Sequence, residues 1–111
     1  MASEPQEGKT IGIVAYITLI GLLIALLMNS DKKSELGKYH IKQSIALHVT
    51  GFAFGIIYSI PFIGWFLAIL TGWLVSIGLI VLAVLGIVKA ANGEMKPVPL
   101  IGKYAEQYLT F

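Results

Sequence analysis

A polar stripe that carries both histidines of the chain is the first candidate for chemistry. His40, Ser44 and His48 recur at a spacing of four residues. Residues four apart lie on one face of an α-helix, so these side chains share a face, with Gln43 beside them. An ionisable side chain inside an apolar helix is a candidate functional site. Two interpretations stay open: a polar helix start bonded to neighbouring helices, and a proton or substrate pathway.

This stripe lacks the partners that catalysis or metal binding requires. His40 and His48 are separated by roughly 12 Å along a helix, so they cannot share one metal ion. Ser44 would need a base that a third group orients, and no carboxylate lies within any apolar block. The chain has no cysteine, which excludes thiol catalysis and cysteine-ligated metals. We therefore predict a non-enzymatic protein without catalytic residues, metal or cofactor.

The composition indicates a membrane protein rather than a soluble domain. Hydrophobic residues make up 57% of the 111 residues and charged residues 13%, about half the share in a soluble domain. The mean hydropathy is +0.83. The formal net charge is only +2 and every basic residue is a lysine, so we expect no nucleic-acid partner. The expected partners are the lipid bilayer, further copies of the chain and other membrane proteins.

Three apolar blocks are long enough to cross a bilayer as helices, which takes about 20 residues. They lie near residues 11–28, 43–60 and 65–88. Pro61 and Gly64 bound a short break that suits a tight turn between the last two helices. The sequence thus predicts an all-α integral membrane protein with about three transmembrane helices. A polar segment at 1–10 precedes a single membrane domain at 11–105, and residues 106–111 form the C-terminal end.

Small residues recur every four positions on the second and third blocks. Such stripes form a smooth groove in which two helix backbones approach closely, and close packing is a main source of helix association in lipid. We interpret them as the contact within the hairpin, while a dimer face or a pore lining stays open. The residues concerned are Gly51, Gly55, Ser59, Gly64, Ala68, Gly72 and Ser76.

The end of the chain predicts an irregular segment followed by a short interfacial helix. Gly93 is a helix stop, and Pro97 and Pro99 prevent the helix from continuing. An apolar stripe with a spacing of four then suits a helix lying along the membrane surface. The stripe consists of Leu100, Tyr104 and Tyr108.

The lysines predict the orientation of the three spans. With three spans, the N-terminus and the 61–64 turn share one side, which carries only Lys9, while the other side carries the other seven lysines. Because basic loops stay in the cytoplasm, we expect a cytoplasmic C-terminus and an N-terminus outside. The expected location is the inner (plasma) membrane of a bacterium.

Tyr39, His40 and Gln43 are predicted to form a polar cluster where the second span begins on the cytoplasmic side. His40 and Gln43 together offer several hydrogen-bond donors and acceptors. The segment at 97–102 offers a backbone that its two prolines keep out of a regular helix. Two versions stay open: a clamp between the second span and the tail, and a site at which the same groups receive a segment of a partner.

Two motifs resemble a known family. The first is an aromatic-His-x-x-Gln-small signature at residues 39–44, and the second is the ending at 89–102, which closes with Gly102. With the hydrophobic pattern over about 11–105, they resemble bacterial membrane proteins of the Tic-twenty-like superfamily, related to the import component of the chloroplast inner envelope. The resemblance implies an accessory or scaffold subunit related to protein import or insertion, and many bacterial members are domains of unknown function. An oligomeric small transporter or channel is the alternative.

Overall fold

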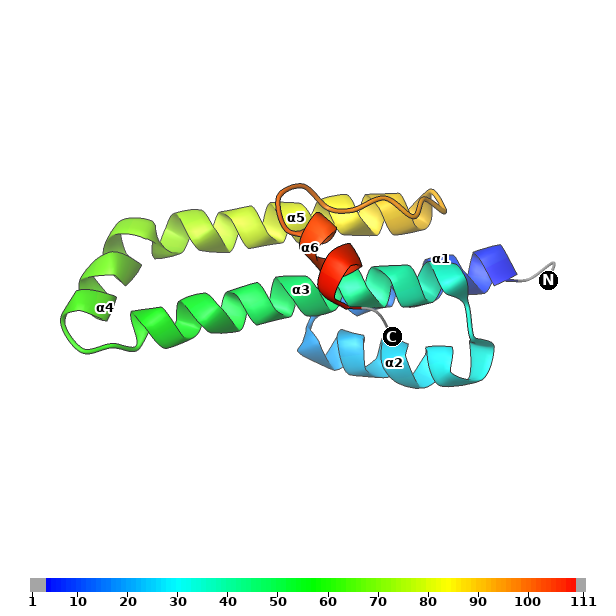
Figure 1. Cartoon of the computed structure of the whole chain (residues 1–111), viewed down its shortest axis with the longest axis horizontal. Helices are drawn as coiled ribbons and strands as arrows, with labels where there is room; N and C mark the ends of the chain where they lie inside the picture. Colours follow the sequence, from blue (N-terminus) through cyan, green and yellow to red (C-terminus); the bar gives the residue numbers. More distant parts are fainter. Residues whose placement is uncertain (1–3, 110–111) are drawn as a thin grey trace.

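The computed structural model describes residues 4–109, and all its regular elements are helical. Figure 1 shows their arrangement. The elements are α1 (Glu4–Ile17), α2 (Leu19–Lys32), α3 (Glu35–Tyr58), α4 (Ile63–Leu67), the π-helical turn η1 (Ala68–Gly72), α5 (Trp73–Ala91) and α6 (Gly102–Tyr108). The predicted all-α class is confirmed.

A long antiparallel hairpin is the frame of the molecule. One arm is α3, and the other is the continuous helix Ile63–Ala91, formed by α4, η1 and α5. The hairpin lies along the longest dimension of the molecule, which measures 54 × 23 × 22 Å. The shorter helices α1 and α2 pack against only one half of it, so the half that includes the turn stands alone (Figure 1).

The first apolar block is two helices rather than one span, so the predicted span at 11–28 is wrong. Thr18 has an extended backbone (φ −156°, ψ 177°), and its hydroxyl accepts a 3.1 Å hydrogen bond from the Gly21 amide. Thr18 therefore caps α2, and the chain turns back on itself. A Cβ on Gly21 would overlap the Val14 carbonyl oxygen, so the two helices meet closely here. Hydropathy cannot reveal this reversal, because the residues on both sides of it are equally apolar.

One helix of residues 4–109 is long and apolar enough to cross a membrane, namely Ile63–Ala91 with 29 residues. Only 6% of the residues in its most apolar 18-residue stretch are buried, so most of the side chains there face outward. Helix α3 has 24 residues, but its first half carries Lys38, His40 and Lys42. The prediction of three spans is therefore not confirmed.

The N-terminal end of α1 lies beside the tail. A Cβ placed on Gly93 in the tail would lie 3.2 Å from the Lys9 side chain on α1. At the same end of α1, Glu7 forms a 3.5 Å ion pair with Lys32 on α2. This end of the molecule is opposite the turn before α4 (Figure 1). The predicted arrangement, with the N-terminus on the same side as that turn, is wrong because it assumed that the first block crosses the membrane completely.

The small-residue stripes form only part of the predicted hairpin contact. A Cβ on Gly64 would overlap the Ile57 carbonyl oxygen, so the backbones do meet closely at the turn. Gly51 and Gly72 are only partly covered by neighbouring side chains, and nothing lies within 4 Å of a Cβ on Gly55. Ser59 and Ser76 are exposed, while Ala68 is half-buried. The π-helical turn breaks the α-helical period, so residues before and after it do not keep one common face.

Candidate functional site

Four polar side chains are buried among residues 7–109, and three of them come from the first half of α3. Ser34, which caps that helix, is 1% exposed, and the other three are fully buried. Buried polar groups cost free energy unless they are hydrogen-bonded, so their partners show what this region does. The three residues on α3 are His40, Gln43 and Ser44.

Gln43 holds the tail with two hydrogen bonds. Its amide nitrogen Nε2 donates to the Gly102 carbonyl oxygen at 3.0 Å, and its Oε1 accepts from the Val98 amide at 3.0 Å. The tail between α5 and α6 follows no regular helix, as Pro97 and Pro99 require. Its backbone groups at 98 and 102 therefore need an outside partner, and Gln43 supplies both a donor and an acceptor.

His40 joins the same tail to α1. Its Nε2 lies 2.7 Å from the Glu94 carbonyl oxygen, which can only accept, so Nε2 carries the proton. Its Nδ1 lies 2.8 Å from the Tyr16 hydroxyl and then accepts from it. Neutral His40 is thus fully bonded. Burial lowers the pKa of His40, and the positive charge of Lys89 acts in the same direction, whereas the hydrogen bond to Glu94 opposes them.

Tyr39 fixes the position of α6. Its hydroxyl donates to the Glu106 carboxylate at 2.8 Å, and the buried Ala105 faces inward from the same helix. Burial, together with the hydrogen bond and the negative charge of Glu106, raises the pKa of Tyr39. Tyr39, His40 and Gln43 therefore bind three successive parts of the C-terminal region, and we call these contacts the tail clamp.

The members of the predicted polar stripe bind different parts of the fold. The Ser44 hydroxyl donates to the Ala15 carbonyl oxygen on α1, whereas His48 donates from Nδ1 to the Ser44 carbonyl oxygen at 2.8 Å and lies 3.3 Å from the Ser44 hydroxyl. The half-buried His48 ring lines an open, mostly apolar groove of about 570 Å³ between α3, α5 and the end of α1. His40 and Ser44 thus bond to other parts of the fold, and His48 lines this groove together with Ser44.

Tyr16 is a member of the site that the sequence analysis missed. Its hydroxyl binds His40, and its ring packs where Gly86 leaves room on α5. A signal was present, since a tyrosine inside an apolar block needs a hydrogen-bond partner for its hydroxyl when it is buried. In residues 4–109, no group of three His, Cys, Asp or Glu side chains is placed to hold a metal ion.

The buried state of His40 predicts a loss of stability in mild acid. Its pKa in the folded protein lies below the ordinary value of 6.5, so below that pH the unfolded chain binds more protons than the folded one. The stability gained by keeping His40 neutral is fully present above about pH 6.5. It is lost as the pH falls toward the pKa of His40 in the folded protein, by at most about 1.4 kcal/mol per pH unit.

The measurement is the melting temperature in detergent between about pH 7.5 and 5.5, a range that brackets the ordinary histidine pKa. The control is His40→Gln, which does not titrate but can still donate to Glu94 and accept from Tyr16. As the pH is lowered, we expect the melting temperature of this variant to decrease less than that of the wild type. Equal decreases in the two proteins would show that His40 is not responsible.

Comparison with known proteins shows a consistent set of relatives. The family model described as the magnetosome magnetite crystal formation protein family matches residues 7–105. The chain is 32% identical over 100 residues to UPF0132 membrane protein MJ1527 of Methanocaldococcus jannaschii, which covers 87% of this chain and 66% of that protein. It is 33% identical over 105 residues to UPF0132 membrane protein MJ1443 of the same organism, and this match covers 95% of this chain and 87% of that protein. The chain thus spans just under two thirds of MJ1527. No solved structure matches.

These matches overturn the resemblance to the Tic-twenty-like superfamily. Both motifs on which it rested lie inside the matched residues 7–105, and the relatives found there point to a different family. A histidine with a glutamine three residues later, and a helix stop followed by prolines, are short patterns. In this chain they serve the tail clamp, a structural task that does not identify a family.

Proposed function

Because this chain belongs to the magnetosome magnetite crystal formation protein family, and its relatives are named membrane proteins, we propose that it acts as a non-enzymatic membrane scaffold. One observation carries the proposal. Each of the four buried polar side chains is hydrogen-bonded to the chain itself, so the polar groups serve to hold the fold and its tail. From the family description we take only a structural role at a membrane.

The proposed placement has two spans and one partial insertion. Helix α3 from about Gln43 onward and the helix Ile63–Ala91 cross the bilayer, while α1 and α2 enter from one side and return to it. No lysine lies between residues 43 and 88, so all eight lie toward the end that holds the tail. Because basic segments stay in the cytoplasm, both termini are cytoplasmic in this proposal. The location is the plasma membrane of a prokaryotic cell.

The alternative is a small transporter or channel that works as an oligomer. It requires His40, Gln43 and His48 to line a path, but only His48 faces the open groove well away from the tail. His48 therefore separates the two functions. A scaffold needs the tail clamp but would still work without the His48 imidazole. A transport path lined by His48 would not work without it.

Purified protein in vesicles tests the choice. We expect proton and ion flux no greater than in empty vesicles, and we expect His48→Phe to complement a deletion strain as well as the wild type at an equal protein level. Crosslinking in native membranes should yield the same discrete products for both proteins. Flux that depends on His48 would contradict the scaffold and support the alternative.

A further inference from the structure

Leu100 combines a strained backbone with an exposed apolar side chain. Its φ is +70°, in the left-handed region that side chains other than glycine rarely adopt, and it is 81% exposed. Glycine adopts this conformation without strain, so the turn itself does not need a leucine. A residue held in such a conformation points to a function for its side chain.

The tail clamp explains how the strain is maintained. The two hydrogen bonds of Gln43 attach to Val98 and Gly102, on either side of Leu100. Backbone bonds from Ile101 to Pro99 and from Gly102 to Val98, at 2.8 and 3.0 Å, close the turn between them. The backbone of this segment is therefore fixed from both sides, and the Leu100 side chain projects outward.

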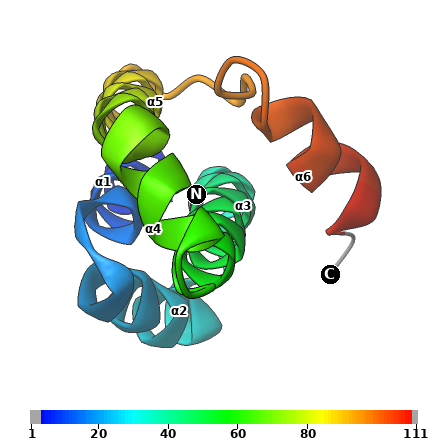
Figure 2. The same cartoon turned by 90° about the vertical axis from the view of Figure 1, so that its left-hand side faces the viewer.

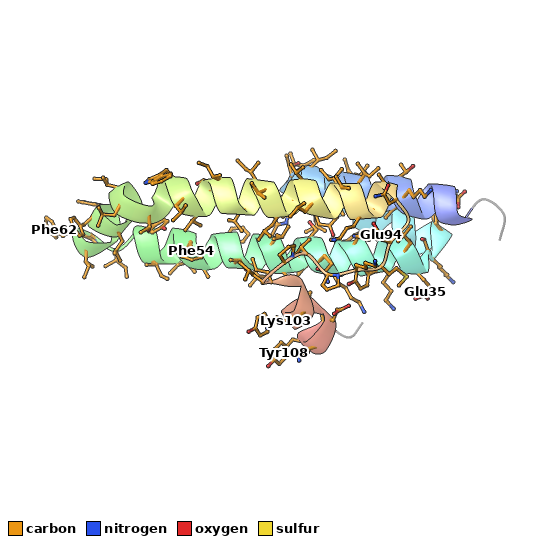
Figure 3. The ribbon with its side chains drawn as sticks, turned by 90° about the horizontal axis from the view of Figure 1, so that it is seen from above. Glu35, Phe54, Phe62, Glu94, Lys103 and Tyr108 are labelled. Atoms are coloured by element: carbon orange, nitrogen blue, oxygen red, sulfur yellow. The ribbon has the colours of Figure 1, made fainter. Side chains whose placement is uncertain are left out.

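The helix that follows Leu100 in the sequence carries exposed aromatic and basic side chains. Tyr104 and Tyr108 are exposed and stack with ring centroids 6.4 Å apart, and Lys103 Nζ lies 5.2 Å from the centre of the Tyr104 ring. Helix α6 lies on one side of the molecule, where it contacts α3 (Figure 2), and Lys103 and Tyr108 point away from the other helices (Figure 3). We call the following residues the tail patch: Lys96, Leu100, Lys103, Tyr104 and Tyr108.

The position of the tail patch along α3 suits a membrane surface. Gln43 and Tyr39 tie the tail to α3 where its charged first turns meet the uncharged stretch that follows Lys42. Tyrosine rings and lysine side chains are favoured at this boundary, where the ring is buried among acyl chains and the polar end stays in water. An apolar face flanked by lysines is typical of segments that bind the lipid interface.

We propose that the tail patch inserts Leu100 and the two tyrosine rings into the headgroup region, and that Lys96 and Lys103 bind the phosphates of anionic lipids. Lys96 pairs with Glu94 at 3.3 Å, but its side chain is 68% exposed, and such surface pairs are weak. The inference rests on the membrane placement within the proposed function. It does not depend on the scaffold role, since no protein partner enters it.

The absence of cysteine permits a clean test in the full-length protein. A single Gln107→Cys change on the exposed side of α6 carries a polarity-sensitive fluorophore and leaves the patch intact. The protein is placed in phosphatidylcholine vesicles, with or without phosphatidylglycerol. We expect stronger protection from an aqueous quencher with phosphatidylglycerol, and about a fivefold loss of this preference for each of Lys96→Gln and Lys103→Gln.

Leu100→Gly tests the anchor separately from the fold. Glycine relieves the strain, so melting in detergent should be unchanged or higher, while probe protection falls in both kinds of vesicle. Lys33→Gly is the matched control, because Lys33 is also exposed with a positive φ of 53° but lies outside the patch. It should leave probe protection unchanged.

Three results would overturn the proposal. One is unchanged protection in Leu100→Gly, and another is equal protection in the two lipid mixtures. The third is protection in native membranes but not in vesicles, which would mean that a protein covers the patch. Failure of the scaffold role would leave all the vesicle measurements unchanged, so the two proposals can fail separately.

Discussion

Replacing Gln43 with leucine is expected to lower the free energy of unfolding by roughly 2–6 kcal/mol, because two buried backbone groups would each lose a partner at about 1–3 kcal/mol. The Val98 amide and the Gly102 carbonyl oxygen bind the Gln43 side chain, which is fully buried. Leucine fills a similar volume without offering a hydrogen bond. The variant should melt earlier in detergent, and limited proteolysis should cut first in the tail after Ala91.

Gln107→Leu is the matched control for this prediction. It makes the same chemical change on the exposed side of α6, where substitutions typically alter stability by no more than about 0.5 kcal/mol. If Gln43→Leu and Gln107→Leu behaved alike, the tail clamp would not hold the fold together. If Gln43→Leu kept its stability but lost cellular function, Gln43 would belong to a site for a partner instead.

The sequence identified the region of the tail clamp because unsatisfied polar groups are costly on both sides of the contact. Gln43 is an amide near an apolar stretch, and two prolines leave the 97–102 backbone without helical hydrogen bonds. Features that depend on local chemistry were thus visible without coordinates.

The reversal at Thr18 was not visible, because it depends on packing between distant segments. Hydropathy treats residues 11–28 as one uniform run, whereas Tyr16 and Gly12 on α1 lie against Gly86 and Ala90 on α5. These contacts hold α1 against α5. The predicted position of the N-terminus failed for the same reason, since it depended on the number of complete crossings.

The close approach of α1 to α5 leads to the second large effect, expected at Gly86. A Cβ there would overlap two ring atoms of Tyr16 and lie 2.9 Å from a third. The ring cannot move freely, because its hydroxyl is bonded to His40 and the residue is 5% exposed. Overpacking of this kind typically costs about 1–3 kcal/mol, so Gly86→Ala should lower the free energy of unfolding by that amount.

Gly78 on the same helix is the control, because nothing lies within 4 Å of a Cβ placed there. Alanine is favoured over glycine inside a helix by roughly 0.5–1 kcal/mol, so Gly78→Ala should be neutral or stabilising. The two changes are chemically identical, and their opposite effects on melting in detergent would report the packing of α1. A Tyr16→Ala background should abolish most of the Gly86→Ala penalty, since the coupling between two residues in contact is lost when one is removed. Equal effects at Gly86 and Gly78 would contradict the packing of α1 against α5.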